Sequence, residues 1–490
     1  VARVAVVGAG FSGLAAGCHL RGAGHDVVVC ERETVPGGRA AVLERDGYRI
    51  DTGPVVLTMP GLLAEPFAAV GEELDDHLTL RRLDPMYRAC FADGSELRVR
   101  PERDAMAEEI RALAGAADAA AFARFCRWLS ELYEVEMPNF IARNYDSPVA
   151  LARHPLALLR LARLGGLRHL APKVASYFRD ERLRRVFSFQ ALYAGLSPFD
   201  ALALFGVITY MDTVAGVYFT DGGIHEAARA LSTAAEKGGV ELRLGEAVER
   251  IERDRDGTAA GVRLASGELV AADAVVCTAD LPVAYRELLD LPPPRVARRG
   301  RYSPSCLLWL RGGSGDAPAG AAHHNIHFGA EWHESFDDLV GRGEQMRDPS
   351  LLVTMPTLTD PALAPGRRST LYALEPVPNL DGRVDWHAES EPARDALIAR
   401  VAGFGYPVEA EVEELIDPVE WERRGCERGT PFALAHSFFQ SGPFRPSNRD
   451  RRIPGLVFAG SGTVPGVGVP MVLVSGRLAA RRVEEWLEGR

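Results

Sequence analysis

The sequence predicts an α/β fold whose central sheet is assembled from both ends of the chain. An apolar strand at residues 4–7 enters a GxGxxG turn at residues 8–13, and a helix-like stretch leads to a second apolar strand at residues 27–30. Near the other end, residues 455–463 read as a strand that enters another glycine-rich turn before a helix. A nicotinamide-binding domain is complete within about its first 150 residues. A chain that returns to its cofactor at its far end therefore indicates an FAD enzyme.

The first turn has the residues that a Rossmann-like dinucleotide site requires. Gly8 permits the tight turn, Gly10 lets the backbone approach a pyrophosphate, and Gly13 lets the following helix pack on the strand. The amides of Phe11 and Ser12 open that helix, where the positive end of its dipole favours phosphate. Strand, turn and helix occur in the order that makes this motif specific.

An acidic residue, Glu31, ends the second strand. At this place a carboxylate accepts hydrogen bonds from the ribose hydroxyls of the adenosine, and its charge disfavours the 2′-phosphate of NADP. Glu31 therefore supports FAD as the cofactor.

Composition excludes several classes of function. The formal net charge of −11 argues against nucleic acid as a partner. Seven cysteines occur without a CxxC pair, which favours a reducing compartment and argues against disulfides or structural zinc. No signal-peptide pattern opens the sequence. We therefore expect a cytoplasmic protein.

The segment Gly37-Gly38-Arg39 continues the fingerprint. Here the sequence resembles the large FAD family that includes amine oxidases, protoporphyrinogen oxidases and carotenoid desaturases. The resemblance implies that Gly37 and Gly38 bring backbone close to the cofactor. It also implies that Arg39 neutralises the pyrophosphate or reaches the flavin edge, and a guanidinium suits both tasks.

Over nearly its whole length the chain resembles the bacterial-type phytoene desaturases. The segments that carry this resemblance are residues 187–190, 195–199, 218–223 and 465–470. The resemblance implies a flavoprotein that converts colourless phytoene stepwise into a coloured carotenoid such as lycopene. From the motifs and the resemblance together, the residues expected to bind FAD are Gly8, Gly10, Phe11, Ser12, Gly13, Glu31, Arg32, Gly37, Gly38, Arg39, Gly53, Pro54, Val55, Val248, Gly460, Gly468, Val469, Pro470 and Met471.

The expected domain organisation follows from the same resemblance. The Rossmann-like FAD-binding domain is discontinuous, and an α+β substrate domain carries a helical, membrane-facing part. We assign residues 1–85, 222–290 and 430–490 to the FAD domain, and residues 86–221 and 291–429 to the substrate domain, with 104–215 mainly helical and membrane-associated.

A basic, leucine-rich segment at residues 151–177 supports a membrane role independently of the resemblance. It contains no acidic residue in an acidic chain. Such segments are typical of interfacial helices, and a hydrocarbon substrate has to be collected from a bilayer. The alternative is a core helix with a solvated basic face, and Pro155 and Gly165-Gly166 argue against one straight helix. We expect peripheral contact with the inner face of the membrane.

The catalytic groups are harder to predict. An apolar polyene has no heteroatom, so catalysis must come mainly from positioning against the flavin and exclusion of water. Weak candidates for handling the proton are Asp51, Arg143, Asp146 and Arg153, although Asp51 suits a turn cap before Gly53-Pro54 better. The electron acceptor for the reduced cofactor is expected to be oxygen or a membrane quinone.

Other functions remain as alternatives. One is an oxidoreductase or reductive cyclase of another polyene, and another is a prenyl carrier of the GDP-dissociation-inhibitor fold, in which the phosphate fingerprint is degraded. Amine oxidation is disfavoured because the only lysines, Lys173 and Lys237, are poorly placed to hold a water near a flavin. The histidines of residues 323–333 lack metal-site spacing, so no metal is expected. His436 suits a place near the flavin and a structural role equally.

Overall fold

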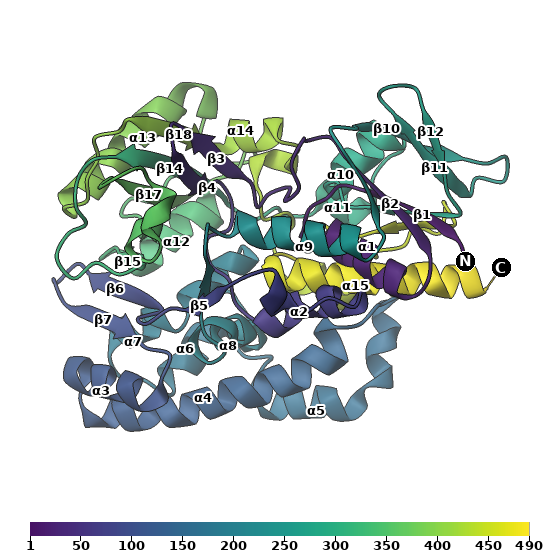
Figure 1. The fold of residues 1–490 in the computed structure, drawn as a ribbon. Coiled ribbons are helices and arrows are strands. Elements are labelled where there is room, and N and C mark those ends of the chain that lie inside the picture. Colours follow the sequence, from purple (N-terminus) through teal and green to yellow (C-terminus); the bar gives the residue numbers. More distant parts are fainter. Residues whose placement is uncertain (490) are drawn as a thin grey trace.

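The computed structural model describes residues 1–489 and confirms the predicted α/β fold. A parallel sheet, a larger mixed sheet and a helical part pack against one another, and the first helix, α1 (Phe11–Gly22), lies against the last helix, α15 (Val469–Glu488) (Figure 1).

The parallel sheet takes its five strands from widely separated parts of the chain. Its order is β19-β13-β1-β2-β9, and every neighbouring pair is parallel. The strands are short and rich in valine, as is typical of parallel strands that are covered on both faces. Their bounds are β1 (Arg3–Val7), β2 (Asp26–Glu31), β9 (Glu241–Leu244), β13 (Ala274–Cys277) and β19 (Leu456–Phe458).

Alternate side chains of this sheet enter two separate cores. Val4 and Val6 of β1 pack on one side with α1 (Phe11–Gly22) and α15 (Val469–Glu488). On the other side, Ala5 and Val7 pack against the antiparallel sheet β10-β11-β12 and the helices α10 and α11. The bounds of these elements are β10 (Val248–Arg253), β11 (Ala259–Leu264), β12 (Leu269–Ala271), α10 (Leu281–Val283) and α11 (Arg295–Arg299).

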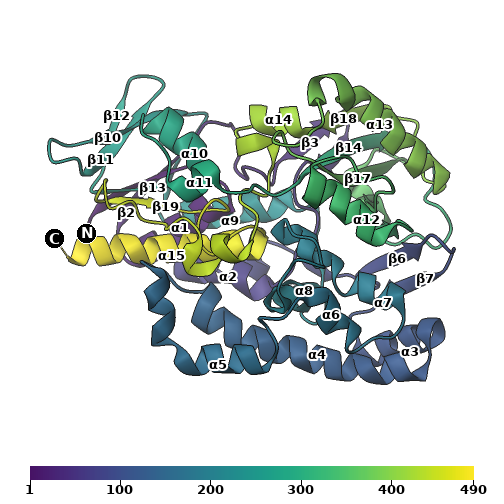
Figure 2. The same ribbon diagram turned by 180° about the vertical axis from the view of Figure 1, so that it is seen from behind.

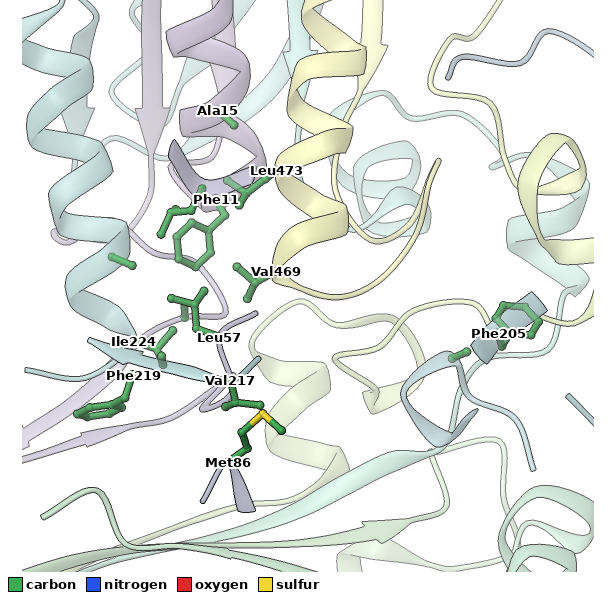
Figure 3. Packing of buried hydrophobic residues seen from close by; sticks show 14 of the residues in the cluster. Phe11, Ala15, Leu57, Met86, Phe205, Val217, Phe219, Ile224, Val469 and Leu473 are labelled. Carbon is green, nitrogen blue, oxygen red and sulfur yellow. The ribbon is translucent and has the colours of Figure 1, made fainter. Parts of the chain in front are cut away.

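Helices α1 and α15 pack closely, so the first and last helices of the chain form one unit (Figures 1 and 2). Gly476 of α15 permits this approach, because a Cβ there would lie 2.9 Å from the Ala16 amide nitrogen of α1. Figure 3 shows Phe11 at the start of α1 beside Leu473 and above Val469 of α15. The helices α2 (Pro60–Ala69) and α9 (His225–Lys237) complete this layer.

The mixed sheet has seven strands in the order β18-β14-β17-β16-β15-β6-β7. One face, with Leu307 and Trp309 of β14, packs against helix α13 (Trp386–Gly403). Leu308 and Tyr372 lie on the opposite face, which looks into the molecule. The strands are β6 (Tyr87–Phe91), β7 (Glu96–Val99), β14 (Ser305–Gly313), β15 (His324–Phe328), β16 (Leu351–Thr354), β17 (Ser369–Val377) and β18 (Val412–Ile416).

The helical part lies along one edge of the molecule, where α4 and α5 run side by side (Figures 1 and 2). No helix within residues 1–489 combines the length and the apolar composition needed to cross a bilayer. Its helices are α3 (Arg103–Ala114), α4 (Ala116–Glu136), α5 (Pro155–Arg163), α6 (Leu170–Ala175), α7 (Glu181–Val186) and α8 (Gly206–Thr213). The remaining elements are two small antiparallel pairs, β3 (Val42–Arg45) with β4 (Tyr48–Asp51) and β5 (Leu80–Arg82) with β8 (Tyr218–Thr220), and the short helices α12 (Trp332–Phe336) and α14 (Pro418–Arg423).

The basic segment at residues 151–177 does not form one helix. It contains the end of the 3-10 helix η3 (Pro148–Arg153), then α5 and α6, with breaks at Pro155 and around Gly165-Gly166. These breaks match the proline and glycines in the sequence, because proline begins helices and Gly165 has a φ of +77°.

Candidate cofactor and substrate site

A cavity of about 1370 Å³ lies at the carboxyl edge of the parallel sheet. The residues that follow β1, β2, β13 and β19 line it, as expected for a ligand site in an open α/β sheet. The same cavity continues between the mixed sheet and the helical part, where leucine, phenylalanine and valine side chains predominate. One end is therefore suited to a dinucleotide and the other to an apolar molecule.

The turn after β1 leaves room for an anion. Gly8 has a φ of +99°, and Gly10 pairs with Gly37 across the turn. Helix α1 begins at Phe11 without a side-chain cap, so its first-turn amides face the cavity with the positive end of the helix dipole. Gly13 does not line the cavity but packs on the turn, since a Cβ there would lie 3.1 Å from the Gly8 carbonyl carbon and closer to its oxygen.

Glu31 lies buried at the end of β2 and is held by backbone donors. Its Oε2 accepts a hydrogen bond from the Ala9 amide at 2.7 Å, and its Oε1 accepts one from the Glu33 amide at 3.0 Å. These bonds aim the carboxylate at the edge of the glycine turn, the position at which a ribose hydroxyl would be recognised.

Arg39 joins the separate parts of the chain at this site. Its guanidinium forms an ion pair with Asp280 at 3.2 Å, donates to the Pro431 carbonyl at 2.9 Å and donates to the Ser461 hydroxyl. Asp280 is buried and also accepts from the amides of Leu281 and Glu427. The arginine is thus oriented along the cavity wall, where a guanidinium can meet a phosphate or a flavin edge.

The carboxy-terminal turn contributes a second helix N-terminus to the cavity. Helix α15 begins at Val469 after Gly468, without a side-chain cap. Gly466 is required here, because a Cβ would meet the ring of His436. His436 is buried, and burial lowers its pKa well below the usual value, so the ring is neutral. His436 lines the cavity, and its Nε2 is buried without a hydrogen-bond partner among residues 1–489.

The residues present fit FAD. The uncapped start of α1 suits a pyrophosphate, Glu31 suits a ribose, and the uncapped start of α15 adds a second helix N-terminus on the cavity wall. The structure places the predicted FAD residues together on the cavity wall, with only Gly13 behind it: Gly8, Gly10, Phe11, Ser12, Glu31, Arg32, Gly37, Gly38, Arg39, Gly53, Pro54, Val55, Val248, Gly460, Gly468, Val469, Pro470 and Met471.

The four weak catalytic candidates lie elsewhere. The Asp51 carboxylate accepts hydrogen bonds from the amides of Ile224 and His225 at 2.8 and 3.0 Å, so it caps helix α9 rather than the turn that follows it in sequence. Burial raises the pKa of Asp51 to about 6. Its place behind the cavity wall gives it a structural role.

Arg143 and Arg153 line a second, smaller cavity of about 510 Å³ next to α15. Asp146 accepts hydrogen bonds from Arg449 and Arg482 at 3.0 and 2.7 Å and lines neither cavity. None of these three side chains lines the larger cavity.

The histidines of the mixed sheet have their own hydrogen-bond partners. His323 and His324 bond Thr359 and Thr354, and His327 bonds Tyr406. Within residues 1–489, no group of three or more His, Cys, Asp or Glu side chains is arranged to hold a metal ion.

Two buried carboxyl groups of the apolar half were not predicted from the sequence. Glu136 ends α4 and Asp212 lies near the end of α8, and both line the larger cavity. Nothing in their local sequence marks them, because each is one polar residue at a buried position of a helix. Only the packing of α4 beside α8 reveals that they share one cavity.

Comparisons with known proteins agree with this geometry. A family model described as flavin containing amine oxidoreductase matches residues 11–484. The chain is 50% identical over 491 residues to a phytoene dehydrogenase of Streptomyces griseus, covering 99% of this chain and 95% of that protein. It is 38% identical over 494 residues to a zeta-carotene-forming phytoene desaturase of Myxococcus xanthus, covering 99% and 94%. A crystal structure of an oxidoreductase from Methanosarcina mazei shares the fold with a TM-score of 0.62 at 17% identity, covering 99% of this chain and 100% of that one.

Proposed function

Because the chain belongs to the flavin-containing amine oxidoreductase family and is an FAD-dependent oxidoreductase, we propose that it desaturates phytoene to a coloured carotenoid such as lycopene. The observation that carries this proposal is the continuity of the cavity, in which the dinucleotide cradle opens directly into an apolar chamber. The names of the two relatives support the same substrate.

The chain's residues hold a hydrocarbon by shape and exclude water. Leu308, Leu352 and Leu374 line the cavity from the mixed sheet, and Val207 and Met211 line it from α8. Apolar contact of this kind binds a polyene without directional bonds, so reactivity depends on which carbon is held against the cofactor. FAD bound in the cradle supplies the acceptor for a hydride from an allylic methylene.

The structure also supports contact with a membrane. Six apolar side chains are exposed near the helical edge of the cavity, and we call them the apolar rim: Val149, Leu156, Leu159, Leu167, Phe438 and Phe439. Leu156 is 80% exposed and Phe439 is 72% exposed. Leu167 and Phe438 line the cavity as well, so the rim adjoins the substrate chamber. Exposed aromatic and leucine side chains of this kind insert into the headgroup region of a bilayer.

Arginines beside the rim favour anionic lipids. The smaller cavity is lined by Arg143, Arg153 and Arg481, together with Arg477, which is ion-paired with Glu65, and one acidic residue, Glu485. Each basic residue near an anionic surface contributes about 1 kcal/mol to attraction. This concentration of positive charge on an acidic chain supports peripheral binding to the inner face of a membrane. There, oxygen or a quinone would accept the electrons from the reduced FAD.

Production of the protein in cells that accumulate phytoene tests the substrate. We expect structured carotenoid absorbance in the extracted pigment, and none with Gly13→Ala, because that change disrupts the FAD cradle. Pigment-free cells that contain soluble, FAD-loaded protein would contradict the proposal and favour another polyene. The relatives do not favour the carrier function, and the intact glycine turn argues against it.

Flotation with vesicles tests the membrane contact. The double change of Phe438 and Phe439 to serine should weaken binding by at least about tenfold, because burying one phenylalanine contributes about 1.5–3 kcal/mol. Leu358→Ser is the matched control, since Leu358 is 49% exposed but lies beside the mixed sheet, outside the apolar rim. Equal binding of both variants would contradict the assignment of the rim.

A further inference from the structure

Desaturation requires a proton acceptor that the apolar substrate cannot supply. Loss of hydride from one carbon leaves a cationic centre, and the neighbouring carbon must then lose a proton to complete the double bond. At the parallel-sheet end of the cavity, Glu31 is held by two amides and Asp280 by Arg39. The other acids that line this end are exposed or ion-paired: Glu33, Glu287 and Glu414.

Among carboxyl and imidazole side chains, three remain as candidates on the walls of the cavity: Glu136, Asp212 and His436. Burial lowers the pKa of His436 well below its usual value, which makes it a weak base. Burial alone raises the pKa of Glu136 well above its usual value, and its Oε1 has no hydrogen-bond partner within residues 1–489. Glu136 therefore has no donor on Oε1 to stabilise a negative charge, and burial favours its neutral form, which makes it a poorer proton acceptor.

Asp212 differs because both of its oxygens accept hydrogen bonds. Gln190 Nε2 donates to Oδ2 at 3.0 Å, and Thr213 Oγ1 donates to Oδ1 at 2.8 Å. Gln190 is itself fully buried and held by the Val186 carbonyl at 3.1 Å, so its amide is oriented toward the carboxyl group. Donors of this kind stabilise a carboxylate that burial would otherwise neutralise.

Asp212 also lines the same continuous cavity as Gly53, one of the residues expected to bind FAD. Tyr372 Oη donates to the Gly53 carbonyl at 3.0 Å, which places the β17 wall beside the turn expected to contact the flavin. Tyr193 lines the same cavity, and burial, followed by the charge of Asp212, raises the pKa of its hydroxyl. Asp212, Tyr193 and Tyr372 are therefore polar side chains on an otherwise largely apolar part of the cavity wall.

We propose that Asp212 is the proton acceptor of the desaturation reaction, an assignment that rests on the proposed function. In this step one allylic C–H bond breaks and its hydrogen leaves with two electrons as hydride to FAD. The C–H bond on the neighbouring carbon then breaks, its electron pair forms the new C=C bond, and its proton binds the Asp212 carboxylate. The neutral carboxyl group later returns that proton to solvent.

The protonation state of Asp212 gives the proposal a pH dependence. Burial raises the pKa of Asp212 to about 7. The titratable groups around Asp212 are Tyr87 of β6 and Tyr193 of the 3-10 helix η4 (Phe189–Ala194), and Glu136 of α4 lines the same cavity. No ion pair in the described chain involves Asp212. The carboxylate is the active form, so the rate should rise with pH and level off above about pH 7.

The test measures the anaerobic reduction of bound FAD by phytoene in liposomes between about pH 5 and pH 9. We expect Asp212→Asn to slow it at least about 100-fold and to remove the inflection near pH 7, because a positioned general base contributes about 10²–10⁴ to the rate. Asp212→Glu should retain an inflection. Asp118→Asn is the control, since Asp118 is a buried carboxylate that binds the amides of Arg179 and Asp180 outside the cavity.

An infrared pH titration of substrate-free protein gives a readout that does not depend on turnover. The carboxylic acid absorbance that titrates near pH 7 should be equal in the original protein and in Asp118→Asn and smaller in Asp212→Asn, whereas the contribution of Asp51, with a pKa of about 6, remains in all three. If Asp212→Asn does not fold, two measurements still test the proposal. They are the pH inflection in the rate of Asp212→Glu and the infrared carboxylic acid band of the original protein.

The outcomes separate this inference from the proposed function. Failure of the original protein to reduce FAD with phytoene contradicts the proposed function itself. An active protein whose Asp212→Asn variant keeps its rate within about twofold, or keeps the inflection, overturns the assignment of Asp212.

Discussion

Gly476→Ala tests whether the two ends of the chain build the cofactor site together. The new Cβ would lie 2.9 Å from the Ala16 amide nitrogen and the Ala15 Cβ, and closer still to the Ser12 carbonyl oxygen. Ordinary contacts begin near 3.4 Å, and the Ser12 oxygen sets the limit, so α15 and α1 must separate by about 1 Å. A gap of this size forfeits about half of the dispersion energy of facing atoms.

The expected loss of stability is about 1–2 kcal/mol. Overpacking a close interface costs about 1–3 kcal/mol, and alanine recovers up to about 1 kcal/mol through its better helix propensity. The same displacement moves Ser12 at the start of α1 away from the cavity residues at the start of α15. We therefore expect FAD affinity to fall about tenfold, which corresponds to about 1.4 kcal/mol.

The assay combines FAD titration by fluorescence quenching with urea unfolding of the FAD-free protein. Gly17→Ala is the matched control, because Gly17 lies on α1 and its Cβ would have an ordinary contact of 3.4 Å with Val29. It should keep FAD affinity and gain up to about 1 kcal/mol. If Gly476→Ala matches the original protein in both measurements, the close packing of α1 on α15 does not support the site.

Three further changes test individual residues. Gly13→Ala should abolish FAD retention on purification, because its Cβ would overlap the Gly8 carbonyl; retention equal to that of Gly17→Ala would contradict the role of this packing. Glu31→Gln should weaken FAD binding about tenfold in the same titration, since an amide oxygen replaces only one of two carboxylate acceptors; an unchanged affinity would refute this reading. Glu136→Gln should flatten the pH dependence of the free energy of unfolding. The pKa of Glu136 is higher in the folded than in the unfolded protein, so the original protein loses stability as pH rises above about 4.3. Urea unfolding from about pH 4 to pH 8 that gives the same pH dependence for the variant and the original protein would contradict this.

The dinucleotide half of the site could be predicted because its determinants are local. The turn from β1 into α1 and the acid at the end of β2 lie within residues 3–31, where spacing alone defines the geometry. The carboxy-terminal turn was also predictable, since glycines such as Gly460 have a φ that few other residues adopt.

The partners of the predicted side chains could not be read from the sequence. Arg39 meets Asp280 and Ser461, and Asp51 caps helix α9, which begins at His225, because the fold brings distant segments together. Sequence spacing carries no information on such pairs.

The apolar half of the site was the least predictable. Asp212 is one polar side chain at a buried position of a mostly apolar helix, and only the packing of α8 against α4 shows that it belongs to a cavity wall. By contrast, the basic candidates Arg143 and Arg153 were conspicuous in sequence, yet they line a separate cavity. Charge that stands out in a sequence marks a surface more often than a buried reactive group.

The most direct test of the account is anaerobic incubation of the pure protein with FAD and phytoene in liposomes, followed by visible spectroscopy. The account predicts that FAD absorbance bleaches while structured polyene bands grow, with one new double bond for each FAD reduced. Demonstrably bound FAD that remains oxidised, with no polyene bands, would contradict the proposal that this cavity desaturates phytoene.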